Sequence, residues 1–293
     1  MRCPLVGVAP GAARVYACEG QRRAASATLS AGFQGVTTIA RIAITRAVSR
    51  ALEHCELTHL PRRVIDIGLA RRQHAAYEQA LRDAACVVRQ LPEQPGQPDS
   101  VFVEDTAIVL DEVAVITRPG AASRRGEVES MSTALAELRD IVRIEPPGTL
   151  DGGDVLRLYR TLYVGASTRS SAEGIAQLEH LLAPFGYRVV AVPLRDCLHL
   201  KSAVTQVAPG QVLLNPDWVD ARCFPNWEPI AIDPAEPHAA NALRVGDALI
   251  YPASCPRTAN ALRKRGIDVR IVDMSETEKA EGAVTCCSVI LET

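Results

Sequence analysis

The sequence lacks the features that mark several large classes of protein. Its 293 residues carry a formal net charge of only −2, so the chain has no basic excess for binding a nucleic-acid backbone. Its nine cysteines are an odd number with no CxxC pair, a pattern that argues against a secreted disulfide scaffold. No apolar run approaches the ~18 residues that a membrane span needs. We therefore expect a soluble cytoplasmic protein that binds neither nucleic acid nor membrane.

Lysine is scarce as well. Of the 32 basic residues only Lys201, Lys264 and Lys279 are lysines, a skew that we attribute to genome composition and give no functional weight. The hydrophobic share is 47%, and a chain of this length can bury a large core.

The N-terminal segment differs in pattern from the rest of the chain. Prolines and arginines interrupt every apolar stretch that could serve as a signal-peptide core. We expect residues 1–38 to be a disordered N-terminal extension and residues 39–293 to form a single domain. A sharper hypothesis is that the start is mis-assigned and that translation begins near Val36, just before the first clear strand at residues 41–46.

A unit of about 45 residues recurs from residue 66 onward. Each copy contains a helical stretch, a strand rich in β-branched residues and then a pair of short strands. In the third copy Ser170 and Glu173 form a capping box at the start of the helix. The fourth copy is weaker, with a short helix near Trp218. The longer helical stretches are expected at residues 67–85, 123–138, 171–186 and 256–266.

The residues with the most chemical character occupy the same place in each copy, in or beside the turn into the strand pair. They are Glu104 with Asp105, Asp151, His199, Asn241 and Cys286. Successive positions lie 42 to 48 residues apart, which is the signature of a repeat architecture. If five units close into a ring like the blades of a propeller, these side chains converge on the axis. A cysteine, a histidine and several carboxylates would then share one central pocket.

Two adjacent cysteines lie in the terminal apolar run, and a buried cysteine often behaves simply as a small hydrophobic residue. Alternation along the expected strand at residues 286–292 turns one of the two toward the core. Cys286 lies at the loop end of that strand, where the pocket should be, and Cys287 points the other way. We therefore predict that Cys286 is the nucleophile.

The histidine and the carboxylates each have a structural and a functional interpretation. His199 lies between two leucines and would fit a buried core histidine, but its place in the repeat favours a functional role. Asp151 either caps the glycine turn that follows it or orients the histidine. Glu104 and Asp105 follow an apolar triplet, so the burial cost of at least one carboxylate must be met, and a bound cation would meet it.

Arg124 and Arg169 each begin a helical stretch, where the helix dipole slightly disfavours a cation. That misfit is explained if each arginine binds an anion such as a carboxylate. The alternative is that both arginines are ordinary solvated surface residues. Asp99 follows a proline and fits a simple turn residue. Cys286, His199 and the carboxylates could hold zinc, but none of the common ligand spacings is present, so we expect no required metal.

Five segments carry most of the recognisable motifs: PDSVFVEDTA, TRPGAASRRGEV, LDGGDV, LHLKS and TCCSV. In this order and at these distances they closely resemble the dimethylarginine dimethylaminohydrolase family, one of the guanidine-modifying enzymes. The resemblance covers about residue 40 to the C-terminus and is weakest across residues 215–265. It implies a five-bladed, pseudo-symmetric α/β propeller of ββαβ units with the active site on the axis, and it makes residues 39–293 a catalytic domain.

The resemblance also assigns roles to the matched positions. It implies that Cys286 is the nucleophile, His199 the general acid and base, and Asp151 the partner of the histidine. The positions implied to bind substrate are Asp99, Glu104 and Asp105 for the guanidinium, Arg124 and Arg169 for the carboxylate, Leu57 or Leu60 as a mobile lid, and Ala280. Ala280 and Glu281 depart from the commonest eukaryotic pattern, which concerns contacts to the substrate's backbone.

The implied reaction is hydrolysis of N-omega-methylated arginines, asymmetric dimethylarginine and monomethylarginine, to citrulline and dimethylamine or methylamine. It proceeds through a covalent Cys286 intermediate, and the nearby carboxylates should keep Cys286 a thiol until the cationic substrate arrives. No organic cofactor is implied, and zinc bound at Cys286 and His199 would inhibit. The expected partner is the small-molecule substrate, and the protein is expected to be a monomer or a homodimer.

Three alternatives share these residues: an arginine or agmatine deiminase, an amidinotransferase, and a non-catalytic methylarginine-binding protein. Related arginine deiminases usually carry an aspartate two residues after the histidine, where this chain has Lys201. The missing carboxylate leaves room for N-methyl groups and favours a methylated substrate. An intact set of cysteine, histidine and aspartate favours an enzyme over a binding protein.

Overall fold

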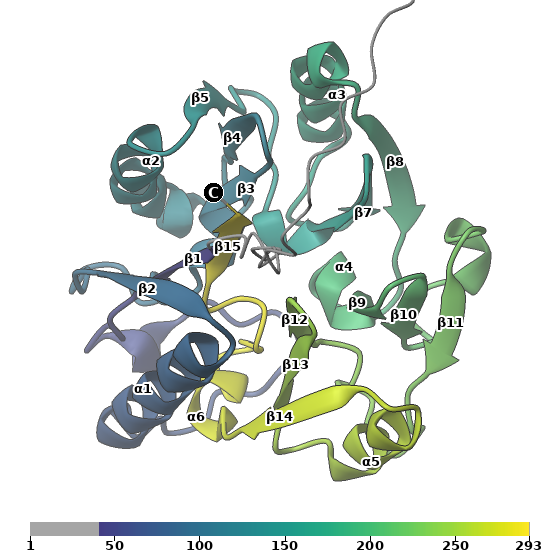
Figure 1. The fold of residues 1–293 in the computed structure, drawn as a ribbon. Coiled ribbons are helices and arrows are strands. Elements are labelled where there is room, and N and C mark those ends of the chain that lie inside the picture. Colours follow the sequence, from purple (N-terminus) through teal and green to yellow (C-terminus); the bar gives the residue numbers. More distant parts are fainter. Residues whose placement is uncertain (1–40, 293) are drawn as a thin grey trace, which may run out of the picture. The chain divides into compact units, whose positions relative to one another are not determined.

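The structure, a computed structural model, describes residues 41–292. These residues contain five mixed sheets of three strands each (Figure 1). In every sheet the central strand pairs antiparallel with one neighbour and parallel with the other. A ββαβ unit produces this pattern, because a hairpin gives the antiparallel pair and a crossover returns the third strand in parallel. The expected five-bladed α/β propeller of ββαβ units is confirmed.

Four blades follow one another along the chain. The first contains β3 (Ala107–Val109), β4 (Val113–Ile116), α2 (Val128–Ala136) and β5 (Asp140–Arg143). The second contains β6 (Val155–Leu158), β7 (Thr161–Ala166), α3 (Ala172–Leu182) and β8 (Arg188–Pro193). The third contains β9 (Val204–Ala208), β10 (Gln211–Leu214), the 3-10 turn η6 (Ala221–Cys223) and β11 (Glu228–Ala231). The fourth contains β12 (Leu243–Val245), β13 (Ala248–Pro252), α5 (Pro256–Lys264) and β14 (Asp268–Val272).

The fifth blade joins segments from opposite ends of the described chain. It contains β15 (Val289–Glu292), β1 (Arg41–Arg46), α1 (Ile67–Asp83) and β2 (Cys86–Leu91). Strands β15 and β1 pair antiparallel, and an ion pair of 2.9 Å between the Arg41 Nε and the Glu292 carboxylate lies across them. This pairing closes the ring, because the C-terminal strand supplies the inner edge of the blade that β1 begins.

Helix α1 shows why these segments are helical. The side chain of Asp66 accepts a hydrogen bond of 2.9 Å from the backbone N–H of Leu69, which caps the free N-terminus. Ala70, Tyr77 and Leu81 are fully buried, and their spacing of three to four residues per turn places them on one face. That face packs against the core beside β2, so burial of one stripe stabilises the helix in its blade.

Three expectations about element boundaries are wrong. The cap of α3 is Ser171, whose hydroxyl accepts from the Gly174 N–H, and not Ser170 of the predicted capping box. The predicted helix near Trp218 is only the 3-10 turn η6. The last strand begins at Val289, so Cys286 and Cys287 lie in the turn before it. Strand alternation therefore does not decide which cysteine faces the site.

The loops that enter the inner strands meet at the centre of the propeller. The short elements η2 (Val103–Thr106), η4 (Gly152–Asp154) and α4 (Leu200–Ala203) immediately precede β3, β6 and β9, and η4 contacts both of the others. The inner strands β3, β6, β9, β12 and β15 line a central cavity of about 230 Å³. The predicted convergence of repeat positions on the axis is thus realised.

The described residues belong to one compact unit, Ile39–Thr293. The expectations of an N-terminal extension at residues 1–38 and of a start near Val36 concern residues outside the described range. Within residues 41–292, no helix has both the length and the apolar character that crossing a membrane requires. The remaining short elements are η1 (Leu52–His54), η3 (Ala122–Glu127), η5 (Ala183–Phe185) and α6 (Ser275–Glu278).

Candidate active site

A small cavity of about 20 Å³ lies where these loops meet. Seven predicted site residues line it: Asp99, Asp105, Arg124, Arg169, His199, Ala280 and Cys286. Three others lie around it, with Asp151 behind the histidine, Glu104 on the side of the central cavity, and Leu57 packed on the adjoining core. A space of this size holds about one water molecule, so an amino acid can enter only if part of the wall moves.

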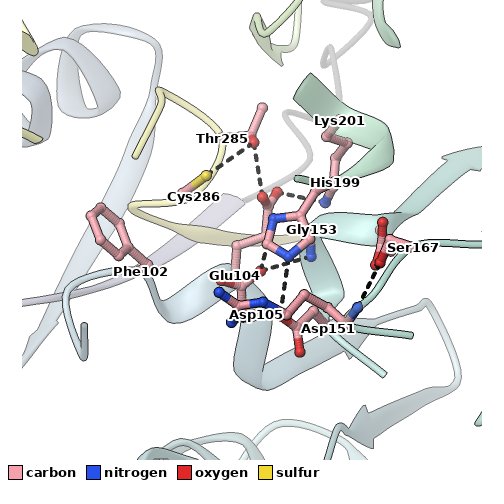
Figure 2. A network of polar contacts seen from close by, with 12 residues as sticks. Phe102, Glu104, Asp105, Asp151, Gly153, Ser167, His199, Lys201, Thr285 and Cys286 are labelled. Atoms are coloured by element: carbon pink, nitrogen blue, oxygen red, sulfur yellow. Dashed lines mark hydrogen bonds and ion pairs between the residues drawn. The ribbon is translucent and has the colours of Figure 1, made fainter. Parts of the chain in front are cut away.

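His199 and Asp151 form a buried hydrogen-bonded pair (Figure 2). The His199 Nε2 lies 3.0 Å from the Asp151 Oδ2, and the other oxygen of Asp151 accepts the Gly120 N–H at 2.9 Å. On the opposite edge of the ring, Nδ1 lies 4.0 Å from the Asp105 Oδ1. Burial alone would lower the pKa of His199, but the charge of Asp105 and the bond to Asp151 outweigh it and raise the pKa to about 9. At neutral pH the imidazole is protonated.

Asp105 connects the histidine to a buried arginine. Its Oδ2 accepts from the Arg124 Nη1 at 2.5 Å, and its Oδ1 accepts from the Gly153 N–H at 2.9 Å. Burial would raise the pKa of Asp105, but the positive charges of His199 and Arg124 prevail and lower it to about 2. Arg124 also donates to both oxygens of Glu127, so its guanidinium is already held within the protein.

The two neighbouring cysteines differ in exposure. Cys286 is only partly buried and lines the small cavity, whereas Cys287 is fully buried in the core. Burial and the negative charges of Glu104 and Asp105 raise the pKa of the Cys286 thiol to about 12. The resting site therefore pairs a neutral thiol with a protonated imidazole. A thiol in this state needs a further cation nearby before it becomes nucleophilic.

Glu104 lines the central cavity and not the small one, and its carboxylate is bonded to two neighbouring side chains. Lys201 Nζ lies 2.5 Å from its Oε1, and the Thr285 hydroxyl donates to its Oε2 at 2.8 Å (Figure 2). Burial nevertheless raises the pKa of Glu104. Asn241, the repeat position of the fourth blade, accepts the Thr285 N–H at 3.1 Å and donates to the Lys201 carbonyl at 3.0 Å. These bonds join the loops that carry Glu104, the histidine and the cysteine.

Comparisons with known proteins agree with this geometry. A family model described as N,N dimethylarginine dimethylhydrolase, eukaryotic, matches residues 61–221. Over 251 residues the chain is 43% identical to N(G),N(G)-dimethylarginine dimethylaminohydrolase of Streptomyces coelicolor, an alignment that covers 85% of this chain and 96% of that protein. The chain belongs to the dimethylarginine dimethylaminohydrolase family.

Other members of the family support the assignment. The protein of that name from Pseudomonas aeruginosa is 36% identical over 225 residues, covering 76% of this chain and 89% of the relative. A solved structure of the Pseudomonas aeruginosa protein, a cysteine-to-serine mutant complexed with citrulline, matches with a TM-score of 0.82 and 34% identity. The match covers 86% of this chain and 100% of that chain. The expected family and fold are confirmed.

The glycines of the LDGGD segment are required by close packing, because neither has a positive φ. A Cβ on Gly153 would lie 2.7 Å from both the His199 Nδ1 and the Asp105 Oδ1. A Cβ on Gly152 would overlap the backbone carbonyl of Glu104. The interpretation of these residues as a simple glycine turn is therefore incomplete, since they let the loops of three blades touch.

The segment that carries the expected lid leucine is held against the cavity by residues that line it. Glu281 accepts the backbone N–H groups of Thr58, His59 and Leu60 at 2.9, 2.5 and 2.6 Å. Asp99 accepts the Glu56 N–H at 3.1 Å. Both leucines, at positions 57 and 60, are half-buried, so the geometry leaves the choice between them as predicted. Opening this segment must break bonds to side chains of the cavity wall.

Several residues of the site escaped the sequence argument. Additional residues line the small cavity: Glu56, Phe102, Leu198, Gly282 and Glu281, of which Glu281 had been noted only as a departure from the eukaryotic pattern. Phe102 and Leu198 lie inside motifs that were recognised, so their position was available as a signal, whereas nothing in the sequence singled out Glu56 or Gly282 as cavity residues. Among the described residues, the potential metal ligands that gather within 4.8 Å of one another are Asp105, Asp151 and His199. That group differs from the predicted zinc pair of Cys286 and His199.

Proposed function

We propose that this protein hydrolyses asymmetric dimethylarginine and monomethylarginine to citrulline, releasing dimethylamine or methylamine. The observation that carries the proposal is the placing of Cys286 and the buried His199 around one cavity that also contains Asp99 and Asp105. This arrangement offers a nucleophile, a proton donor and anionic groups for a guanidinium within a single small space. The assigned activity of the named relatives is consistent with it.

The proposed chemistry has two covalent steps. As the cationic substrate binds, the Cys286 thiol releases its proton to solvent, and the thiolate attacks the guanidinium carbon. Protonated His199 gives its proton to the methylated nitrogen as the carbon–nitrogen bond breaks. The product of this half-reaction is a thiouronium on Cys286 and a free amine. Neutral His199 then takes one proton from water, whose oxygen attacks the same carbon. The carbon–sulfur bond breaks to release citrulline, and the remaining hydroxyl proton passes to the departing sulfur, which restores the thiol. Asp151 stabilises the imidazolium at the start and end of the cycle.

Substrate binding supplies the missing activation of the thiol. A guanidinium about 4 Å from the sulfur, at an effective dielectric constant near 20, favours the thiolate by roughly 4 kcal/mol. That corresponds to about three pKa units. The proposal gives Asp99 and Asp105 the task of holding this cation, with Glu104 reinforcing the negative field from its position beside Thr285.

The remaining predicted residues are proposed to bind the amino-acid end of the substrate. Arg169, with 11% of its side chain accessible against 5% for Arg124, binds the carboxylate directly, and Arg124, whose guanidinium is held by Asp105 and Glu127, attracts it by its positive charge. Ala280 lies at the cavity wall beside the expected path of the substrate backbone. Leu57, or alternatively Leu60, closes over the bound substrate as part of the segment that Glu281 holds.

Selectivity for methylated substrates is proposed to follow from Lys201. Its ammonium pairs with Glu104, so the position that would carry a second guanidinium clamp in a deiminase carries a cation instead. The cavity then has no carboxylate on that side to demand an unsubstituted nitrogen. The competing assignment, an arginine deiminase, makes the opposite prediction for substrate preference.

The test compares citrulline formation from asymmetric dimethylarginine and from arginine. The proposal expects faster turnover of the methylated substrate, loss of activity in Cys286→Ser, and retained activity in the matched control Cys287→Ser. Equal or faster turnover of arginine would reassign the protein as a deiminase. Activity that survives Cys286→Ser would refute the proposed nucleophile.

The reaction as written uses only protein side chains, substrate and water, so we propose that no organic cofactor takes part. Zinc is proposed as an inhibitor that binds Cys286 and His199, and addition of a chelator should then restore activity lost on zinc treatment. We also propose a cytoplasmic location, which agrees with unpaired cysteines at all seven described positions. Sedimentation of the pure protein would decide between a monomer and a homodimer.

A further inference from the structure

Asp154 is a fully buried carboxylate that none of the steps above employs. Its Oδ1 accepts the backbone N–H of Leu200 at 3.0 Å. Its Oδ2 accepts the hydroxyls of Ser167 and Ser170 at 2.5 and 2.6 Å. Burying a charged group is costly, and these three bonds offset part of that cost. An asparagine at this position would not accept all three hydrogen bonds, because one of its two terminal atoms is a donor nitrogen.

The three donors belong to the segments that carry the catalytic pair and one of the substrate-binding arginines. Leu200 directly follows His199 in the chain. The Ser167 hydroxyl accepts the backbone N–H of Arg169 at 3.0 Å. The Ser170 hydroxyl accepts the backbone N–H of Asp151 at 3.2 Å. One carboxylate therefore joins the segments of His199, Asp151 and Arg169 through at most one intervening hydroxyl.

The neighbouring chain makes room for this carboxylate. A Cβ on Gly165, in strand β7, would lie 2.6 Å from the Asp154 Oδ1 and 3.1 Å from the Leu200 Cβ. Gly165 has no positive φ, so its lack of a side chain serves the close approach and not the backbone conformation. The strand and the two loops are thus fitted around Asp154.

We propose that Asp154 is a positioning residue that fixes His199, Asp151 and Arg169 relative to one another for the hydrolysis. The proposal rests on the proposed function for its kinetic consequences, and on the contacts above for its structural ones. Because misplacing a reacting group by about 1 Å can cost roughly 100-fold in rate, a loosened His199 segment should lower kcat. In the proposed mechanism Arg169 binds the substrate carboxylate and takes no part in the covalent steps, so the same change should raise KM by a smaller factor.

The charge of Asp154 gives a second, spectroscopic consequence. The ionisable groups that face it are His199, Asp151 and Cys197, and His199 in turn faces Asp105. The negative charge of Asp154 is one of the contributions that raise the pKa of His199. Removing this charge while keeping the shape should lower the His199 pKa.

The experiment compares Asp154→Asn and Ser170→Ala with the matched control Ser171→Ala. Ser171 is the next residue in the chain, and its hydroxyl accepts the N–H groups of Gly174 and Thr149 with no bond to Asp154. Each variant is measured for kcat and KM with asymmetric dimethylarginine, for the His199 imidazole pKa by NMR, and for thermal unfolding.

We expect kcat to fall roughly 10- to 100-fold in Asp154→Asn and less in Ser170→Ala. The His199 pKa should fall in Asp154→Asn, while Ser171→Ala changes only the unfolding temperature. Unchanged kcat and His199 pKa in both test variants, or equal changes in Ser171→Ala, would overturn the proposal. If Asp154→Asn does not fold, Ser170→Ala and Ser167→Ala decide by kcat. If the wild-type protein itself fails to hydrolyse methylarginine, the proposed function is refuted, and the His199 pKa still decides the role of Asp154.

Discussion

Binding of a cationic ligand should convert Cys286 from a resting thiol into a partly ionised nucleophile. Burial and the charges of Glu104 and Asp105 hold its pKa at about 12 in the free protein. A guanidinium about 4 Å away contributes roughly 4 kcal/mol at an effective dielectric constant near 20, or about three pKa units. The pKa should therefore fall to about 9. At pH 8 the ionised fraction would rise from roughly one molecule in 10,000 to about one in ten.

The assay is a pH titration of the ultraviolet absorbance of the thiolate, taken as the difference between the wild-type protein and Cys286→Ser. The ligand is an amidinium analogue of arginine in which carbon replaces the leaving nitrogen, so that no amine can depart. Glu104→Gln serves as a control, because removing that charge should lower the pKa of Cys286 before any ligand is added. A difference titration that does not move when the cation binds would refute substrate-assisted ionisation.

Three further predictions concern the charged groups around the cavity. The pKa of His199 is raised from 6.5 to about 9, so its contribution to the free energy of unfolding is present in full below pH 6.5 and is lost as pH rises to about 9. Chemical denaturation should show that the difference in free energy of unfolding between wild type and His199→Gln narrows as the pH rises across this range. A difference that stays constant would contradict a protonated imidazole. Lys201→Met should lower the free energy of unfolding by about 3 kcal/mol because it leaves the Glu104 charge buried, and adding Glu104→Gln should recover part of that loss. Additive effects of the two substitutions would exclude the ion pair as a stabilising unit. Glu281→Ala should speed hydrogen exchange at the amides of residues 58–60 and leave the His199 pKa unchanged; unaltered exchange would show that other contacts hold this segment.

The repeat made the fold and the meeting of the candidate residues predictable. Equivalent positions in five units must lie at equivalent places around an axis, and this holds whatever the detailed packing. The spacing alone therefore predicted that four residues meet near the axis: Glu104, Asp151, His199 and Cys286. The structure places each of them directly before an inner strand, as the spacing required.

Local patterns were a weaker guide where a long-range contact competes with them. Ser170 has the sequence of a helix cap, but its hydroxyl donates to Asp154, and Ser171 caps the helix instead. Cys286 faces the cavity because of the turn it occupies, although strand alternation had suggested the same answer for a different reason.

Partners far apart in the sequence could not be predicted from spacing. Lys201 and Glu104 are separated by 97 residues, lie in the loops before β3 and β9 of two non-adjacent blades, and meet only because these loops converge at the centre of the ring. Arg124 was expected to be free for a substrate carboxylate, and its bonds to Asp105 and Glu127 depend on side-chain packing within the buried site. Such contacts decide the pKa values of the site, so its electrostatics required the structure.

The most direct test of the account is the mass of the protein quenched with acid during turnover of asymmetric dimethylarginine. The account predicts a covalent adduct on the peptide that contains Cys286, absent from Cys286→Ser and from a reaction left to completion. Two results would contradict a covalent mechanism at this cysteine. The first is turnover to citrulline with the adduct on another residue. The second is turnover with no adduct in the wild-type protein when His199→Gln also accumulates none.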